Sequence, residues 1–305
     1  MRHLKLFLLL VFLSFALSPE MRLRRVQKDV YMVRGIDSMP SVENRGFTSN
    51  AFGVLTSEGW VVVDALSTPE LSREFVKNLM RVKRAPVKYA LITHYHLDHW
   101  YGAKTYKELG AKVVAHRNLL EVYRSGEAHR ILEVNRQRFG TLLKSVELVP
   151  PDLVVDERML LQVGDKRFEI IALPPAHTDN DLLVYMPKEG IVFVGDLVMK
   201  DRIPFMGDQG ASSKGLLQAL QKVKELRPRV ILGGHNEPMD LSAVDFTAGY
   251  VQFLRENIRK LKEQGKSIEE IKGALKTNPY SKYVMYETFH NINVFRVDAE
   301  LEMEE

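Results

Sequence analysis

The stretch from Thr93 to Trp100 constrains this chain more than any other part of its sequence. Three histidines and one aspartate fall within six residues of it, namely His94, His96, Asp98 and His99. Imidazole nitrogens and carboxylate oxygens are the usual ligands of zinc and similar divalent ions. We therefore interpret this stretch as a metal-binding turn.

The residues on either side place this turn in an α/β fold. Residues 87–93 are apolar and rich in β-branched side chains, which predicts a buried strand. Residues 100–109 predict a helix that ends at Gly110. The turn then joins the carboxyl end of a strand to the amino end of a helix, where ligand sites lie in α/β folds.

Three later polar residues interrupt the ends of apolar strands in the same way. His177, Asp196 and His235 each follow an apolar run that finishes in small residues. A polar side chain in that position can face a cleft without a bulky neighbour. With the turn they make seven candidate ligands, which is enough for two metal ions.

Composition limits the chemistry further. Cysteine is absent, so thiolate metal sites, thiol nucleophiles and disulfides are excluded, and any metal is held by nitrogen and oxygen. Of the 43 basic residues, Arg2 and Lys5 lie near the start, and the other 41 face 39 acidic ones, so the rest of the chain is close to neutral. We therefore expect a small-molecule substrate and no nucleic acid partner.

The first 18 residues have the form of a secretory leader. Arg2 and Lys5 precede a twelve-residue, mostly apolar run from Leu6 to Leu17. A helix needs about 20 such residues to span a bilayer, so this run is short for a membrane segment. We expect an exported protein, periplasmic or extracellular, with loose membrane attachment as the alternative if the leader stays uncleaved.

Beyond the leader, β-rich and helical stretches alternate twice. This pattern predicts an α/β protein, a four-layer αββα sandwich of two mixed sheets with extra C-terminal helices. We assign residues 22–240 to the αββα domain and residues 241–305 to a helical extension packed on it. The last helix is expected over residues 294–305.

The seven candidate ligands, in their order along the chain, resemble the signature of the metallo-β-lactamase-fold hydrolases. That signature is an H-x-H-x-D-H turn followed by a His, an Asp and a His, and the later spacings of 78, 19 and 39 residues suit it. The resemblance extends over residues 27 to 240. It implies that Asp64, at the end of an early strand, supports the ligand turn.

The resemblance also implies the role of each ligand. The first metal would take His94, His96 and His177, the second would take Asp98, His99 and His235, and Asp196 would bridge the two. The cofactor would be two divalent ions, with zinc expected and iron or manganese as alternatives. A hydroxide shared by the metals would attack the substrate, and Asp98 would act in catalysis by orienting the water or moving its proton.

A narrower resemblance concerns the segments 176–181, 195–198 and 202–208, which look most like the exported quinoprotein relay system zinc hydrolases. Relatives with a cysteine at the position of Asp196 are not matched. Thioesterase, lactonase and tRNA-processing members share an Asp at that position. The flavodiiron-type relatives carry Glu where this chain has His96.

The function expected from these observations is metal-dependent hydrolysis of an ester, thioester, lactone or β-lactam. One alternative is a phosphodiesterase or nuclease that uses the same metals. Another is a non-hydrolytic metal-binding protein of a periplasmic redox pathway. No substrate-binding residue is assigned, although Lys200 and Arg202 either meet an anionic substrate group or are solvated loop charges.

The remaining conspicuous side chains are interpreted as structural. His116 is expected to have a structural role, and His129 and His290 are expected at the surface. Trp100 is expected to pack its helix. Core packing is also the default for Tyr283 and Tyr286, with lining of the cleft as the alternative.

Overall fold

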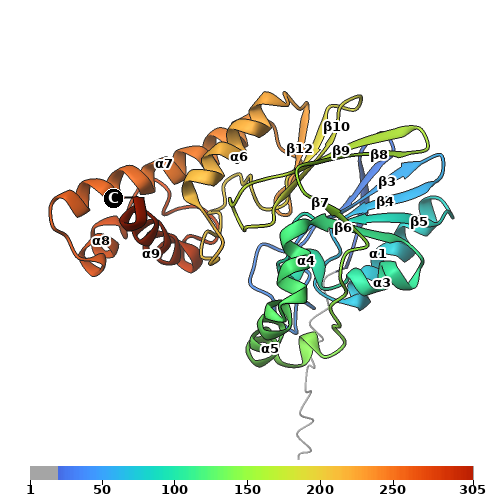
Figure 1. Ribbon diagram of the computed structural model, residues 1–305, viewed down its shortest axis with the longest axis horizontal. Coiled ribbons are helices and arrows are strands. Elements are labelled where there is room, and N and C mark those ends of the chain that lie inside the picture. Colours follow the sequence, from blue (N-terminus) through green and yellow to red (C-terminus); the bar gives the residue numbers. More distant parts are fainter. Residues whose placement is uncertain (1–19, 305) are drawn as a thin grey trace, which may run out of the picture.

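The computed structural model describes residues 20–304, and the leader predicted for residues 1–18 lies outside them. Two sheets pack face to face and helices cover both outer faces (Figure 1). The four-layer αββα sandwich of two mixed sheets is therefore confirmed. Among residues 20–304, no helix has the length and apolar character needed to cross a membrane.

The strands are β1 (Leu23–Gln27), β2 (Val30–Val33), β3 (Ala51–Thr56), β4 (Gly59–Val63), β5 (Val87–Leu91), β6 (Lys112–His116), β7 (Leu153–Val155), β8 (Arg158–Val163), β9 (Lys166–Ala172), β10 (Leu182–Met186), β11 (Ile191–Phe193) and β12 (Val230–Leu232). The helices are α1 (Pro69–Val82), α2 (Leu97–Trp100), α3 (Ala103–Glu108), α4 (Arg117–Arg124), α5 (Glu127–Phe139), the 3₁₀ turn η1 (Gly140–Leu143), α6 (Ser213–Glu225), α7 (Leu241–Glu263), α8 (Ile268–Leu275) and α9 (Tyr286–Glu304).

The first sheet has seven strands in the order β1 to β7. Its first four strands are antiparallel, and β4 to β7 are parallel. Parallel strands need crossover connections, and these carry α1, α3, α4 and α5. The carboxyl ends of β4, β5 and β6 consequently point to one edge of the sheet.

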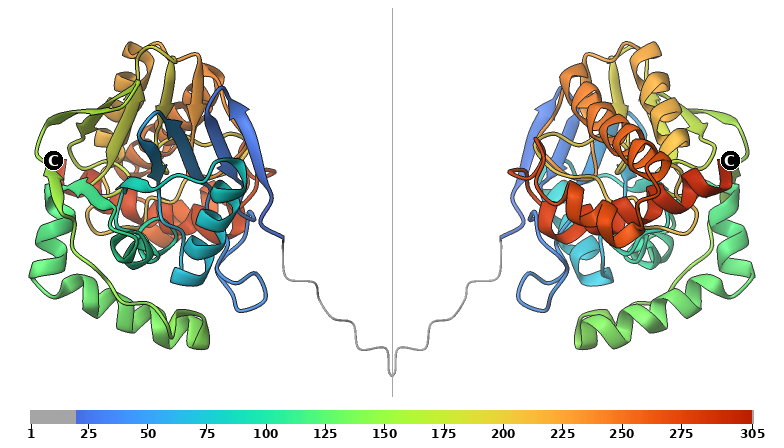
Figure 2. Two further views of the ribbon diagram at one scale, coloured as in Figure 1. Left: turned by 90° about the vertical axis from the view of Figure 1, so that its right-hand side faces the viewer. Right: turned by 90° about the vertical axis from the view of Figure 1, so that its left-hand side faces the viewer.

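The second sheet has five strands in the order β12-β11-β10-β9-β8. Only the β11–β12 pair is parallel, and α6 forms its crossover. Helices α6 and α7 pack on each other, and α9 packs on α7. The C-terminal helices therefore lie on the second sheet's side of the molecule (Figure 2).

Successive side chains of a strand point to opposite faces of the sheet, so each strand contributes to two hydrophobic cores. In β4, Trp60 and Val62 point to the core beneath α1, whereas Val61 and Val63 point to the core between the sheets. All four are fully buried, as expected for a strand covered on both faces. Across the inter-sheet core, the rings of Phe52 and Phe193 meet edge to face at 5.2 Å.

Two expected helices have different bounds. The helix predicted for residues 100–109 is broken into α2 and α3, because the Gly102 amide donates to the Leu66 carbonyl at 3.0 Å. Gly102 also packs so closely that a Cβ there would lie 2.0 Å from the Ala65 carbonyl oxygen. The helix predicted to begin at residue 294 begins at Tyr286. Its first turns are anchored by Phe289, which is buried in the core between the second sheet and its helices.

Glu300 attaches the C-terminal helix α9 to the sandwich. Its carboxylate accepts hydrogen bonds from the Ser213 amide at 2.7 Å, the Ser212 hydroxyl at 2.7 Å and the Lys214 amide at 3.2 Å. These donors belong to the first turn of α6, where the helix dipole favours negative charge. The side chain is buried, so the donors replace the water that the carboxylate loses.

Replacing this carboxylate should destabilise the protein measurably. We expect Glu300→Ala to lower the free energy of unfolding by about 2 kcal/mol, because buried hydrogen bonds to a charged group are lost. The control is Glu302→Ala on the same helix, where an exposed side chain pairs with Lys262 and the change should stay below about 1 kcal/mol. Urea denaturation of the two variants measures the difference, and equal effects would contradict the anchoring role.

Candidate metal centre

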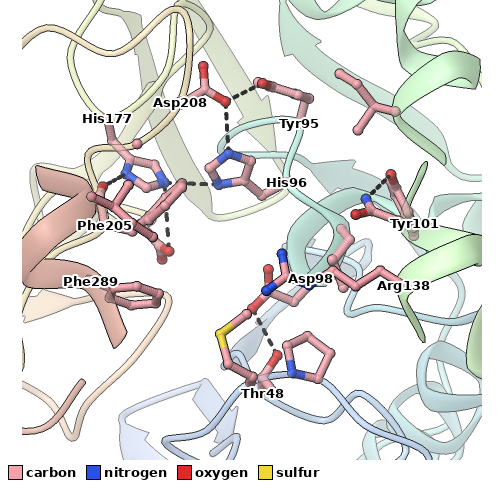
Figure 3. Close-up of a pocket in the computed structure, with 18 of the residues that line it drawn as sticks. Thr48, Tyr95, His96, Asp98, Tyr101, Arg138, His177, Phe205, Asp208 and Phe289 are labelled. Atoms are coloured by element: carbon pink, nitrogen blue, oxygen red, sulfur yellow. Dashed lines mark hydrogen bonds and ion pairs between the residues drawn. The ribbon is translucent and has the colours of Figure 1, made fainter. Parts of the chain in front are cut away.

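The first group of candidate ligands comes from the turn after β5 and the loop after β9. Nε2 of His94 lies 3.1 Å from Nδ1 of His96, and Nε2 of His177 lies 3.0 Å from the same Nδ1 atom. Tetrahedral ligands 2.0–2.1 Å from one zinc ion are about 3.3 Å apart. The three nitrogens therefore have the separation of ligands around one ion. Figure 3 shows two of these residues, His96 and His177, at the pocket.

The second group lies directly beside the first. Nε2 of His99 is 3.7 Å from Oδ1 of Asp98, and Nε2 of His235 is 3.9 Å from Oδ2 of Asp98. His235 arrives from the loop after β12, in the other sheet. The second group is therefore assembled from both halves of the sandwich.

Asp196, in the loop after β11, stands between the two groups. Its Oδ2 lies 3.8 Å from Nε2 of His177 and 3.1 Å from Nε2 of His235, and its Oδ1 lies 3.3 Å from Nε2 of His99. One carboxylate thus contacts ligands of both groups. The structure brings all seven sequence-predicted residues together, which is the arrangement of a binuclear metal site.

Two atoms of this cluster favour bound cations. Nε2 of His99 and Oδ1 of Asp196 are buried and have no hydrogen-bond partner among residues 20–304. Buried polar atoms are nearly always satisfied in native proteins. A divalent ion between these atoms would satisfy both, so the donor set fits the metals that the sequence predicted.

The electrostatics of the two groups agree with this interpretation. Burial and the neighbouring imidazoles hold the pKa of His94 well below its usual value, and burial lowers the pKa of His177 to about 4. Both rings are therefore neutral, as a metal ligand must be. Burial opposes protonation of His99, yet the carboxylates of Asp196 and Asp64 raise its pKa well above the usual value. That half of the site has surplus negative charge for a cation to neutralise.

Asp64 orients the second group through hydrogen bonds to the ligand turn. The Thr93 amide donates to its Oδ1 at 2.8 Å, and the Thr93 hydroxyl donates to the same oxygen at 2.9 Å. Nδ1 of His99 lies 2.8 Å from its Oδ2, so this nitrogen carries the proton and Nε2 is left for a metal. Asp64 therefore occupies the supporting position that the resemblance implied.

Backbone carbonyls orient two more ligands. Nδ1 of His177 donates to the Phe205 carbonyl at 2.8 Å, and Nδ1 of His235 donates to the Thr48 carbonyl at 3.0 Å. The loop that carries His235 is itself held by Asn50, whose amide donates to the Gly233 carbonyl at 2.9 Å. Sequence reasoning did not find these carbonyls, because a carbonyl acceptor has no sequence signal.

Asp208 is a further positioning residue that sequence reasoning did not assign. Its Oδ2 lies 3.2 Å from Nε2 of His96 and also accepts the Tyr95 hydroxyl, and the Gly210 amide donates to its Oδ1 at 2.8 Å. Burial opposes ionisation of Asp208, but the hydrogen bonds from His96 and Tyr95 lower its pKa to about 2. It is therefore an anion that fixes the ring of His96 (Figure 3).

The other conspicuous residues mostly lie where they were expected. His116 caps α4 through the Asn118 amide, and His129 is exposed. Trp100 is buried and donates to the Val149 carbonyl. His290 was predicted at the surface, and this is wrong, because its ring is buried against Tyr286 with a centroid separation of 4.3 Å.

The metal-ligand cluster forms the floor of a cavity of about 550 Å³. His96, Asp98, Asp196 and His235 line this cavity, so a molecule inside it can contact both ligand groups. Arg202, whose role the sequence left open, lines the cavity as well, whereas Lys200 is exposed and does not. Such a volume suits a small-molecule substrate.

Comparison with known proteins identifies the family. Residues 44–235 match the model of the Metallo-beta-lactamase superfamily, which is more than half of the chain. This chain therefore belongs to that superfamily.

Individual relatives are distant. The chain is 21% identical to a metallo-β-lactamase type 2 of Elizabethkingia meningoseptica over 236 residues, which is 75% of this chain and 84% of that protein. A sec-alkylsulfatase of Pseudomonas sp. has a TM-score of 0.73 at 17% identity, covering 90% of this chain and 49% of its own. A metallo-β-lactamase family protein of Thermus thermophilus has a TM-score of 0.68 at 20% identity, covering 91% and 95%. These structures show the same fold.

The supporting role of Asp64 can be tested through metal affinity. We expect Asp64→Asn to weaken binding of the second ion by 10- to 100-fold, because the amide cannot accept the proton of His99 and the backbone donor equally well. Asparagine tolerates the positive φ of 64° at this position. Competition with a chelating dye measures the affinity. Asp201→Asn, an exposed residue with a φ of 55°, is the control, and a loss of the same size there would contradict this role for Asp64.

Proposed function

We propose that this protein is a metal-dependent hydrolase that cleaves an ester, thioester, lactone or β-lactam, with two divalent ions, zinc expected, as its cofactor. The observation that carries the proposal is the pair of three-residue groups at the floor of an accessible cavity, with the carboxylate of Asp196 within 3.8 Å of ligands of both. Two ions held there supply Lewis acidity and lower the pKa of a water toward neutrality. Membership of the superfamily supports this assignment.

Asp98 is the residue that we assign to proton movement. Its carboxylate lines the cavity, and its Oδ2 accepts a hydrogen bond from the Thr48 hydroxyl at 3.0 Å. The Ser49 hydroxyl holds the backbone carbonyl of the same residue. The carboxylate is thus held in place at the floor, where it can orient a water or accept its proton.

A second candidate is hydrolysis of a sulfate or phosphate ester at the same site, which includes the phosphodiesterase alternative. The Arg202 side chain, 5% exposed, supports it. One terminal nitrogen lies 3.3 Å from Oδ1 of Asp37, and its Nε has no hydrogen-bond partner within residues 20–304. A buried guanidinium beside the metal ligands would bind an anionic group. The structural likeness to an alkylsulfatase is compatible with this chemistry.

The narrower expectations stay predictions. They comprise a place among the exported quinoprotein relay hydrolases, the non-hydrolytic redox alternative, export with possible membrane attachment, and the absence of a nucleic acid partner. The division at residue 240 is likewise proposed. Full metal content without turnover on any substrate class would favour the non-hydrolytic alternative.

Metal content and turnover together test the proposal. We expect two divalent ions per chain by elemental analysis, loss of activity after chelation, and recovery when zinc is restored. The substrates are a p-nitrophenyl ester, a chromogenic cephalosporin, p-nitrophenyl sulfate and bis-p-nitrophenyl phosphate. Cleavage of either of the first two supports the proposal, and cleavage of the last two alone supports the second candidate.

Removing the carboxylate of Asp98 should affect turnover much more than folding. We expect Asp98→Asn to lower kcat by about 10²- to 10⁴-fold, because the group that moves the proton is lost. Thermal unfolding should stay close to that of the wild type, and metal content measured on the same sample separates lost ions from lost chemistry. Normal turnover in this variant would remove Asp98 from the mechanism.

A further inference from the structure

The cavity continues from the metal-ligand floor into a chamber lined by helices from two distant parts of the sequence. On one side, α4 and α5 contribute Val122, Ile131 and Phe139. On the other side, α9 contributes Phe289 and Ile292. Phe205 and Met39 line the same cavity. We call the surface formed by these seven residues the apolar chamber.

Several side chains of the apolar chamber are only partly buried. Met39, Ile131, Phe139 and Phe205 are half-buried, and Ile292 is 43% exposed. Apolar surface left facing water costs about 25 cal/mol for each Å². A contiguous patch of this kind usually marks the place where a ligand or partner binds.

Charged residues border the apolar chamber, and the guanidinium of Arg202 lies 6.0 Å from the ring of Phe289. Arg130 pairs with Glu127 at 2.6 Å on an exposed turn of α5. The guanidinium of exposed Arg138, labelled in Figure 3, lies 5.1 Å from the ring of Phe139. The polar amide of Asn135 is used by the Tyr101 hydroxyl at 3.0 Å. The side chains of Arg130 and Asn135 on the α5 wall therefore already have partners within the protein.

The occupant of the chamber must also reach the metal-ligand floor. Residues of the chamber and of the floor line one cavity of about 550 Å³, so a single small molecule spans both. A protein segment or second copy would not need to contact Asp98 and His96. Because one cavity includes both regions, we take the occupant of the chamber to be the apolar part of the substrate itself.

We propose that the substrate carries a long hydrophobic chain, acyl or alkyl, which lies in the apolar chamber while its hydrolysable bond lies over the metal-ligand floor. This inference rests on the proposed function and names its substrate class. Ile131 on α5 and Ile292 on α9 are the specificity-determining residues on the two walls. Water attacks the carbonyl carbon of such an ester, the bond to the alcohol oxygen breaks, and the products are the fatty acid and the alcohol.

A chain-length series with one leaving group tests this inference. p-Nitrophenyl acetate, butyrate, octanoate and decanoate differ only in the acyl chain, and all are used below the concentrations at which they form micelles. Each CH₂ that becomes buried is worth about fourfold in kcat/KM. We expect kcat/KM to rise at least about 100-fold from acetate to decanoate, and a flat profile would overturn the inference.

Matched variants locate the effect in the chamber. Ile131→Asp and Ile292→Asp should lower the decanoate-to-acetate ratio of kcat/KM at least about tenfold, because a charge in the chamber opposes burial of the chain. Val134→Asp on α5 and Phe295→Asp on α9 are the controls, since these residues are 49% and 62% exposed and do not line the cavity. The controls should keep the wild-type ratio, and an equal loss in them would overturn the assignment.

A binding measurement separates this inference from the proposed function. Decanoate and acetate are titrated into the wild-type protein and into Ile131→Asp by calorimetry, so that no turnover is needed. Tighter binding of decanoate, lost in the variant, supports the chamber even if no ester is hydrolysed, and in that case only the proposed function fails. Equal binding of the two acids by the wild type would overturn the chamber assignment.

Discussion

The buried carboxylate of Asp64 is the interaction on which the site depends. It lies where β4 ends, and it accepts hydrogen bonds from Thr93 and His99, which belong to the turn after β5. A buried carboxylate is costly unless it is paired, so these donors must stay in place for the fold to be stable. The parallel register of β4 and β5, with Val63 opposite Leu91, brings the two strand ends to the same level. The pairing of β4 with β5 therefore also fixes the position of Asp64 relative to the ligand turn.

The sequence predicted the fold class and the seven members of the cluster, because four of them lie in one turn after an apolar strand and His177, Asp196 and His235 each follow an apolar strand through small residues. The structure explains the small residues. A Cβ on Gly234 would lie 2.2 Å from Oδ1 of Asp196, and one on Gly195 would lie 2.7 Å from the Thr93 hydroxyl oxygen. The loops of the second sheet approach the turn of the first so closely that side chains at these glycines would block the site.

The parts that the sequence did not predict are tertiary contacts. The carbonyl groups of Phe205 and Thr48 orient His177 and His235, yet any residue type has such a carbonyl. Asp208 is far from His96 in sequence and becomes its partner only when the loop after β11 folds back. His290 was assigned to the surface, before the predicted start of the last helix. In the structure α9 begins at Tyr286 and turns His290 toward Tyr250, whose hydroxyl oxygen lies 3.1 Å from its Nδ1.

The floor and the walls of the cavity are built from different layers. The floor consists of loops at strand ends, and buried neighbours such as Asp64 and Thr48 hold several of its ligands. The walls consist of α5, within the crossover between β6 and β7, and α9, at the end of the chain. Both helices lie outside the two sheets (Figures 1 and 2), so their cavity-facing residues can change without disturbing the metal ligands. If the proposed function and the apolar chamber hold, the loops at the strand ends set the chemistry of this protein and its peripheral helices set the choice of substrate.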